Sequence, residues 1–443
     1  MKGYTISKKS CCVTGFMRWG ITWHKPTVYA TIERYIRQKW YYVMHSNENN
    51  LTAMWKERAK TRHTVVGIRT WHVNLNPRAM PGLGFAKGQW QKPATQTAHV
   101  DWRGPFATQA GALIVEITTD KGLKGYGLGG GGLAGALVIE KHLQHFVIGR
   151  DPLDVEEIWE HLYHITSIYG RRGLVIYALS GIELALVDLC GKIIDAPVYS
   201  LVTDTPCLKI PAYATGADVG YYAENGFAAC KLPLRNGLAE GENGFAQNVE
   251  MIHAARDAIG PEVELMADIY LRWDVDYTIR FAEAADDVRL KWIEEPIPLD
   301  DYAGMAQLVR EVQPTWIVSG EHEFTRYGFR ELLRWQAADM IQPDISWAGG
   351  FTECLRIARE AAVLNIPTWL HQAGTPWGLH LTACLPMPCM AETFGPSRDG
   401  IENKLYRRLR PVPHDGFFSL NDVPGFGVDL DEALLEAYTV DRL

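Results

Sequence analysis

The sequence predicts an α/β protein: a modified TIM-type (β/α)7β barrel with an α+β capping domain. Two observations support this prediction. Residues 205–399 alternate strand-like and helix-like segments, whereas residues 65–200 place strands before helices. A strand–helix repeat is typical of a barrel, and strands followed by helices indicate a mixed domain.

Length and composition fit a globular chain of one large domain or two to three ordinary ones. The 443 residues are 47% hydrophobic and 22% charged, which argues against long disorder. No apolar stretch reaches the ~18 residues that would predict a membrane span. The eight cysteines form no CxxC pair, so we expect a reducing, cytoplasmic location without a disulfide scaffold or zinc module.

Charge is distributed unevenly along the chain. Residues 1–63 hold 12 Lys and Arg against 3 Asp and Glu, although the whole chain has a net charge of −8. This basic extension lacks clean periodicity, and we interpret it as disordered or non-native. A targeting arm and a nucleic-acid patch are the alternatives. The acidic remainder argues against nucleic acid as the main partner.

The capping domain is predicted over residues 65–200, and we expect residues 400–443 to complete it. Its predicted strands are 65–76, 111–119 and 125–128, and its predicted helices are 133–146, 154–163 and 176–194. Gly125–Gly130 matches GxGxxG, a weak dinucleotide-binding signal. Because the motif follows a hairpin turn at 120–122, we interpret its glycines as a tight connection.

The barrel is predicted over residues 205–399, with a helix between most successive strands. The predicted strands are 210–215, 228–232, 263–268, 290–294, 316–320, 340–344, 368–371 and 389–393. The predicted helices include 248–258, 276–285, 302–312, 326–335 and 351–364. The last unit is irregular, because 378–384 leaves room for only a short helix.

Charged and ionisable side chains recur at the ends of these strands. They are Lys231, Asp268, Glu294, Glu321, Asp344, His371 and Glu392. From Asp268 onward, four acids and then His371 follow one another at intervals of about one strand–helix unit. Active sites of such barrels lie at the carboxyl ends of the strands, so we expect these side chains to converge.

Three neighbouring carboxylates need a cation. Burying unpaired charge is costly, and octahedral Mg²⁺ accepts monodentate carboxylate ligands while leaving positions for water or substrate. The alternative is that such acids cap the helices that follow the strands. The recurrence in consecutive units favours a metal site.

Residues 65–443 resemble the enolase superfamily in its mandelate-racemase-like branch of acid-sugar dehydratases, and most of all the L-rhamnonate dehydratase family. The matching stretches are Tyr169-Gly-Arg-Arg-Gly173, the helix 179–189, Tyr213-Ala-Thr-Gly216, Lys231-Leu-Pro-Leu234, Trp292-Ile-Glu-Glu-Pro296, Gly320-Glu-His-Glu323, Ile341-Gln-Pro-Asp344 and Pro424-Gly-Phe-Gly427. Gly-Glu-His-Glu followed by Gln-Pro-Asp is typical of the rhamnonate branch, whereas Glu-Glu-Pro marks the wider superfamily.

The resemblance implies a role for each strand-end residue. Asp268, Glu294 and Glu321 match the ligands of one Mg²⁺ per subunit, and Asp344 and His371 match the dyad that acts as base. Lys231 and His322 match positions at which relatives carry catalytic side chains, although Lys231 is equally well interpreted as a structural partner of the acids, Glu295 among them. Glu392 matches a substrate-binding carboxylate. A lid carrying His99 and Arg103 is expected over the pocket.

The implied activity is that of a hydro-lyase. His371 would remove the C2 proton of a sugar acid, and loss of the C3 hydroxyl, with His371 or His322 as acid, would give a 2-keto-3-deoxy sugar acid. Leu370-His-Gln-Ala-Gly374, Pro388-Cys-Met-Ala-Glu392 and the segment 88–105 depart from the rhamnonate pattern. Another aldonic or aldaric acid, a racemase and a non-catalytic scaffold therefore stay open.

The partner implied is a small-molecule sugar acid, with neither nucleic acid nor membrane. The superfamily further implies a homo-oligomer.

Overall fold

A computed structural model describes residues 51–73, 112–394, 405–406 and 411–439 of the chain. These residues all belong to one unit, 49–443, and the description below concerns them alone.

The cap is built on an antiparallel sheet of order β1-β2-β3, with β1 Val65–Val73, β2 Ala112–Thr119 and β3 Lys124–Gly129. Helix α6, Leu174–Ile194, packs across this sheet. A Cβ atom on Gly127 would lie 2.0 Å from the carbonyl oxygen of Gly181, and one on Gly125 would lie 2.2 Å from that of Ala185. The glycines of the GxGxxG match therefore allow β3 to approach α6 closely.

Shorter helices complete the described cap. They are α3 Gly132–Val138, the π-helical turn Ile139–Leu143, α4 Gln144–Val147, α5 Val155–Thr166, the 3₁₀ turn Val198–Leu201 and the C-terminal α15 Glu432–Tyr438. Helix α15 returns to β1, where Arg69 pairs with Glu432 at 3.2 Å and with Glu436 at 3.0 Å.

One part of the predicted basic extension is folded. Residues 51–58 form helix α2, Leu51–Arg58, which packs against α5 and α6. The Trp55 side chain is fully buried and its indole N–H donates to the Leu201 carbonyl at 3.2 Å. The expectation of disorder is therefore wrong for these residues, because burial of a large aromatic side chain stabilises the helix. Residues 1–50 lie outside the described ones.

The barrel is a curled parallel sheet of order β10-β4-β5-β6-β7-β8-β9, which confirms the predicted fold. The strands are β4 Lys209–Thr215, β5 Ala229–Pro233, β6 Glu264–Asp268, β7 Trp292–Glu294, β8 Trp316–Ser319, β9 Met340–Ile341 and β10 Ala391–Thr393. The expected strand 368–371 forms only single bridges, from Thr368 to Ile341 and from His371 to Asp344. Outside this path, β11 Phe417–Ser419 pairs antiparallel with β4.

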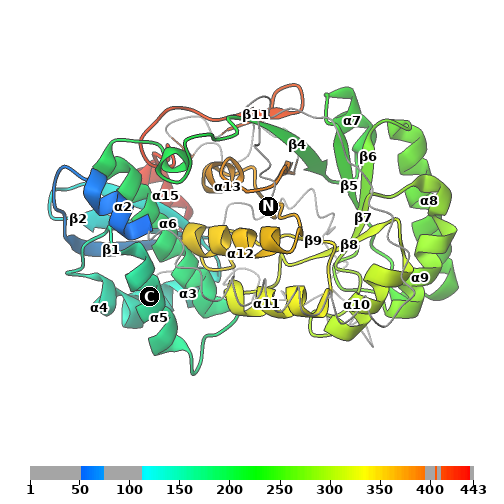
Figure 1. Cartoon of the computed structure of the whole chain (residues 1–443), viewed down its shortest axis with the longest axis horizontal. Helices are drawn as coiled ribbons and strands as arrows, with labels where there is room; N and C mark the ends of the chain where they lie inside the picture. Colours follow the sequence, from blue (N-terminus) through cyan, green and yellow to red (C-terminus); the bar gives the residue numbers. More distant parts are fainter. Residues whose placement is uncertain (1–50, 74–111, 395–404, 407–410, 440–443) are drawn as a thin grey trace, which may run out of the picture. The chain divides into compact units, whose positions relative to one another are not determined.

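Helices cover the outer side of the curled sheet (Figure 1). They are α7 Val219–Glu224, α8 Gly241–Ile259, α9 Val275–Ala284, α10 Tyr302–Glu311, α11 Thr325–Trp335, α12 Phe351–Val363 and α13 Pro376–Thr382, with 3₁₀ turns at Leu238–Glu240 and Asp286–Val288. Helices α9, α10 and α11 begin after Asp274, Asp301 and Phe324 respectively. The strand-end acids Asp268 and Glu294 are therefore not the N-caps of the helices that follow them.

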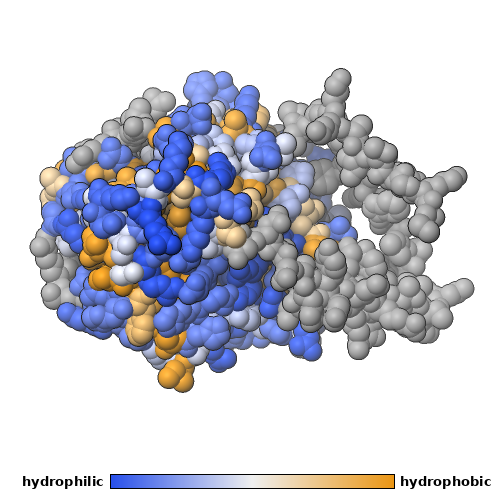
Figure 2. Space-filling model, turned by 60° about the vertical axis from the view of Figure 1, so that its left-hand side comes forward, coloured by the Kyte–Doolittle hydropathy of each residue, from blue (hydrophilic) through white to orange (hydrophobic). Residues whose placement is uncertain are grey.

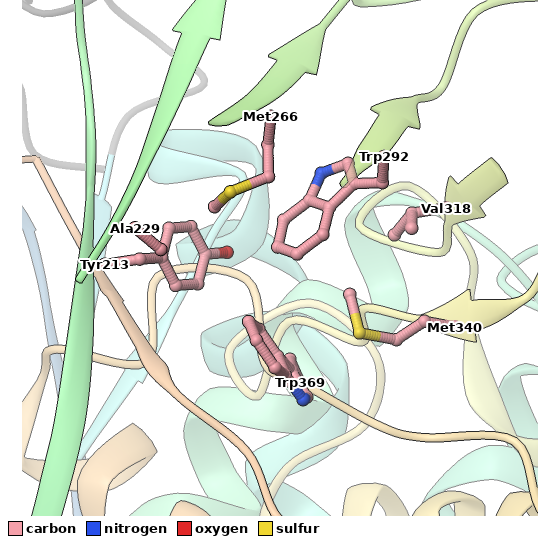
Figure 3. Packing of buried hydrophobic residues seen from close by; sticks show 7 residues of the cluster. All are labelled: Tyr213, Ala229, Met266, Trp292, Val318, Met340 and Trp369. Atoms are coloured by element: carbon pink, nitrogen blue, oxygen red, sulfur yellow. The ribbon is translucent and has the colours of Figure 1, made fainter. Parts of the chain in front are cut away.

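Large side chains fill the barrel interior (Figure 3). Trp292 is one of them, edge-on to Tyr213 at 5.7 Å and to Trp369 at 5.4 Å between ring centroids. Met266 and Met340 pack against the same cluster. Because the interior is filled by apolar side chains, polar chemistry is confined to the ends of the strands.

Helix α6 is long and apolar enough to cross a membrane by composition, but 89% of its apolar window is buried inside the fold. In the view of Figure 2, most of the described surface is hydrophilic, with smaller hydrophobic groups between. The apolar character of α6 is therefore that of a core helix.

Replacement of Gly127 by Ala tests the contact between β3 and α6. The added Cβ would meet backbone atoms at 2.0 and 2.7 Å, so we expect the free energy of unfolding to fall by about 1–3 kcal/mol or more. Gly67→Ala is the matched control, because no atom lies within 4 Å of its added Cβ. Urea unfolding measures both variants, and equal stability of the two would contradict the contact.

Candidate active site

The predicted site residues converge at the carboxyl ends of the barrel strands. Asp268 and Glu294 end β6 and β7 and stand in register with each other. Glu321 and Asp344 lie two and three residues beyond β8 and β9. All four carboxylates are buried.

Lys231 lies among these acids. Its ammonium nitrogen is 2.5 Å from Oε1 of Glu294, 2.9 Å from Oε1 of Glu392 and 3.8 Å from Oδ2 of Asp268. Burial alone would lower the pKa of Lys231, but the carboxylates raise it well above its ordinary value. Lys231 is therefore a buried, charged partner of the strand-end acids.

Glu392 joins the last strand to the first. Its Oε1 accepts a hydrogen bond from the Thr215 hydroxyl at 2.5 Å, and its Oε2 accepts one from the backbone N–H of Gln372 at 2.8 Å. Burial acts to raise the pKa of Glu392, but Lys231 and His371 lower it to about 2. Glu392 is therefore held as a carboxylate.

Asp344 and His371 form the expected pair. Nδ1 of His371 is 2.7 Å from Oδ2 of Asp344, while Oδ1 of Asp344 accepts hydrogen bonds from the backbone N–H and the hydroxyl of Ser346 at 2.7 and 2.6 Å. The carboxylate orients the ring and fixes which nitrogen carries the proton. Nε2 of His371 is consequently the atom that faces the site.

A second histidine and carboxylate pair lies beside the first. Nδ1 of His322 is 2.7 Å from Oε2 of Glu295, and Nε2 of His322 is 3.6 Å from Oε1 of Glu321. The partner of Glu295 is thus His322, not the Lys231 suggested from the sequence. Among the described residues, the group close enough together to hold a metal ion is Glu295, Glu321 and His322, which shares only Glu321 with the predicted ligand set.

Glu321 lies between the two histidines. Its Oε2 is 3.7 Å from Nε2 of His371. Burial would lower the pKa of His371, but Glu321 and Asp344 raise it to about 10. Burial raises the pKa of Asp268 to about 6, against the effect of Lys231. An excess of negative charge therefore surrounds the site.

Aromatic side chains form one wall. The Trp347 ring lies 5.1 Å from that of His371, 5.8 Å from that of His322 and 5.6 Å from that of Tyr177 on α6. Neither Trp347 nor Tyr177 is among the site residues predicted from the sequence. Trp347 could have been found three positions after Asp344, but Tyr177 carries no local signal because it belongs to the cap.

His99 and Arg103, the expected lid residues, lie outside the described residues. Their roles stay predictions.

Two segments of the chain match known protein families. Residues 95–203 match the mandelate racemase / muconate lactonizing enzyme N-terminal domain, and residues 215–434 match the enolase C-terminal domain-like family. An L-rhamnonate dehydratase of Saccharopolyspora erythraea is 38% identical over 333 residues, which cover 72% of this chain and 83% of the relative.

Solved structures of L-rhamnonate dehydratase are similar to this chain over most of its length. L-rhamnonate dehydratase from Gibberella zeae has a TM-score of 0.77 at 31% identity, covering 85% of this chain and 96% of its own. The structure of the Gibberella zeae enzyme complexed with Mg has a TM-score of 0.77 at 30% identity, covering 87% and 98%. These relatives confirm the predicted enzyme class, a hydro-lyase among the acid-sugar dehydratases. The chain belongs to the mandelate racemase / muconate lactonizing enzyme family of the enolase superfamily.

Proposed function

We propose that this protein is a Mg²⁺-dependent sugar-acid dehydratase, with L-rhamnonate as the first candidate substrate. The observation that carries the proposal is the convergence of Asp268, Glu294 and Glu321 with the Asp344–His371 pair at one end of the barrel. Similarity to dehydratases of L-rhamnonate supports the substrate class.

The residues present fit a divalent cation. Six buried carboxylates meet at the strand ends, and the basic side chains among them are Lys231, His322 and His371. The carboxylates are Asp268, Glu294, Glu295, Glu321, Asp344 and Glu392. Asp268, Glu294 and Glu321 would hold the ion, whose chemistry is to stabilise, as a Lewis acid, the charge that develops on the substrate carboxylate.

The proton at C2 would be taken by Nε2 of His371 once a bound cation offsets the negative charge of Glu321, which otherwise raises the pKa of this histidine and keeps it protonated. Asp344 leaves that nitrogen facing the site by accepting a hydrogen bond from Nδ1–H, and the Ser346 hydroxyl donates a hydrogen bond that fixes the Asp344 carboxylate. Removal of the proton gives an enediolate. The C3 hydroxyl then leaves as water with a proton from His371 or from His322, whose rings both contact Trp347. The enol that remains tautomerises to the 2-keto-3-deoxy acid.

The position of Lys231 disfavours a racemase of the same family. Racemisation needs a base on each face of the substrate, and Lys231 is the residue that would oppose His371. Its ammonium instead contacts Glu294 and Glu392 at 2.5 and 2.9 Å, buried from solvent. A lysine held in this way is a poor proton acceptor. We therefore propose a positioning role for Lys231.

A product assay tests the function. Incubated with Mg²⁺ and a panel of aldonic and aldaric acids led by L-rhamnonate, the protein should form a 2-keto-3-deoxy acid from at least one of them. Glu294→Gln and His371→Asn should each lower kcat by about 100-fold or more, because they remove a metal ligand and the base. Product formation is followed by a colour reaction for 2-keto-3-deoxy acids.

Chelation supplies the control for the metal. EDTA should abolish turnover, and added Mg²⁺ should restore it. Exchange of the C2 proton with solvent deuterium, accompanied by inversion and without elimination, would favour the racemase. Turnover that survives both substitutions would contradict the assignment of the site.

Lys231→Met tests whether Lys231 stabilises the buried acids. Without the ammonium, Glu294 and Glu392 are left unpaired, so the free energy of unfolding at pH 7 should fall by about 3–5 kcal/mol. In the variant these carboxyls bind protons more readily when folded than when unfolded. The loss should therefore shrink as the pH falls toward 5.

Lys291→Met is the matched control, because Lys291 lies 3.3 Å from Glu264 at the surface, where an ion pair contributes about 1 kcal/mol or less. Urea unfolding at pH 7 and pH 5 measures both variants. An equal, pH-independent loss in the two would overturn the role given to Lys231.

A further inference from the structure

The contact between cap helix α6 and barrel helix α12 involves two buried polar side chains of α6. Glu183 Oε2 accepts a hydrogen bond from the backbone N–H of Phe351 at 2.7 Å, and its Oε1 accepts one from that of Thr352 at 2.8 Å. The Ser180 hydroxyl accepts one from the N–H of Gly349 at 2.9 Å. Helix α12 lies next to α6 (Figure 1), so a cap helix satisfies the first N–H groups of a barrel helix.

The backbone at this contact is shaped to fit Glu183. Gly350 precedes α12 with a φ of 95°, and a Cβ atom there would lie 2.1 Å from Oε2 of Glu183. The carbonyl of Gly349 accepts a hydrogen bond from the indole N–H of Trp159 on α5 at 2.7 Å. The cap therefore holds residues 349–352 from two of its helices.

These residues end the loop that begins at Asp344. Within the loop, the backbone N–H groups of Trp347 and Ala348 donate to the Asp344 carbonyl at 3.0 and 2.7 Å. Ser346 donates to the Asp344 carboxylate, and the Trp347 ring lies against His371. The start of α12 is therefore connected to the Asp344–His371 pair through a loop of five residues with internal hydrogen bonds.

Burial of the Glu183 carboxyl group costs free energy, which its hydrogen bonds must offset. The side chain is 2% exposed. Burial raises its pKa to about 7, and the N–H donors of Thr352 and Phe351 act in the opposite direction. A carboxylate at a helix N-terminus is favoured by the helix dipole as well as by these hydrogen bonds.

We propose that Glu183 is a positioning residue for the reaction: from the cap, it fixes the loop 344–350 and thereby the orientation of Asp344 against His371. The inference rests on the proposed function in that the Asp344–His371 pair is taken as the base. Through Glu183, the cap would contribute to proton transfer without contacting the substrate.

Two variants disrupt the contact between Glu183 and the start of α12, one by changing the side chain and one by changing the backbone residue beside it. Glu183→Gln keeps the size of the side chain but turns an N–H donor toward one of the backbone N–H groups, and Gly350→Ala places a methyl group against Oε2 of Glu183. Asp188→Asn is the matched control. Asp188 lies on the same helix, is fully buried, and accepts hydrogen bonds from Tyr126 and Phe426, both at 2.9 Å and both away from the loop.

Steady-state kinetics with Mg²⁺ and hydrogen exchange of the full chain give the test. Glu183→Gln and Gly350→Ala should lower kcat by about 10-fold or more with KM changed by less than about threefold, because a misplaced base slows proton transfer without removing a substrate contact. Amides 345–352 should exchange faster in both variants. Asp188→Asn should keep kcat, and those amides should keep their protection, even where thermal unfolding shows an equal loss of stability.

The outcomes separate this inference from the proposed function. If kcat falls in Asp188→Asn as much as in Glu183→Gln, or if Glu183→Gln leaves both kcat and exchange unchanged, the positioning role is overturned. If the wild-type protein turns over no acid, the proposed function fails. The exchange measurement then still decides whether Glu183 orders the loop, because faster exchange confined to the two loop variants supports that ordering and its absence overturns it.

Discussion

The structure depends on one electrostatic constraint: many carboxylates are buried together at one end of the barrel. Asp268, Glu294 and Glu321 repel one another in a region from which water is largely excluded, and such a group is stable only with positive charge nearby. Lys231 supplies part of that charge through its contacts with Glu294 and Glu392. His322, held by Glu295, supplies more when it is protonated.

The barrel is the scaffold that holds these acids together. Its interior is filled by a packed cluster of apolar side chains that includes Trp292, and the acids lie at one end of this cluster. Short parallel strands place consecutive acids side by side, as the register of Asp268 with Glu294 shows. A rigid scaffold keeps like charges together in the folded protein, which is the arrangement that a divalent cation requires.

The cap contributes more than a cover for the barrel. Helix α6 packs on its own sheet through the glycines of β3, and the same helix places Tyr177, Ser180 and Glu183 toward the barrel. The stability of the cap and the geometry of the loop after β9 are therefore linked through one helix. Glu183 and Ser180 contact residues 349–352, and the loop between these residues and Asp344 is the part of the site that lies against the cap.

The sequence by itself determined the periodic parts of this protein. The strand–helix repeat predicted the barrel, and the recurrence of acids at the strand ends identified Asp268, Glu294 and Glu321 together with Asp344 and His371, because a strand end is a local property of the chain. Sequence periodicity placed nearly every described helix of the barrel. It did not reveal α2, whose stability comes from the burial of Trp55 against residues far along the chain.

Only the tertiary structure decided which partners these side chains have. Glu295 pairs with His322, Lys231 with Glu294 and Glu392, and Glu183 with the first N–H groups of α12. Each of these contacts except that of Glu295 with His322, which follow the consecutive strands β7 and β8, joins residues on strands that are not consecutive in the chain, or residues of the cap and the barrel. Spacing along a sequence fixes the height of a side chain in the barrel, but its hydrogen-bond partner depends on how the sheet closes and how the cap docks.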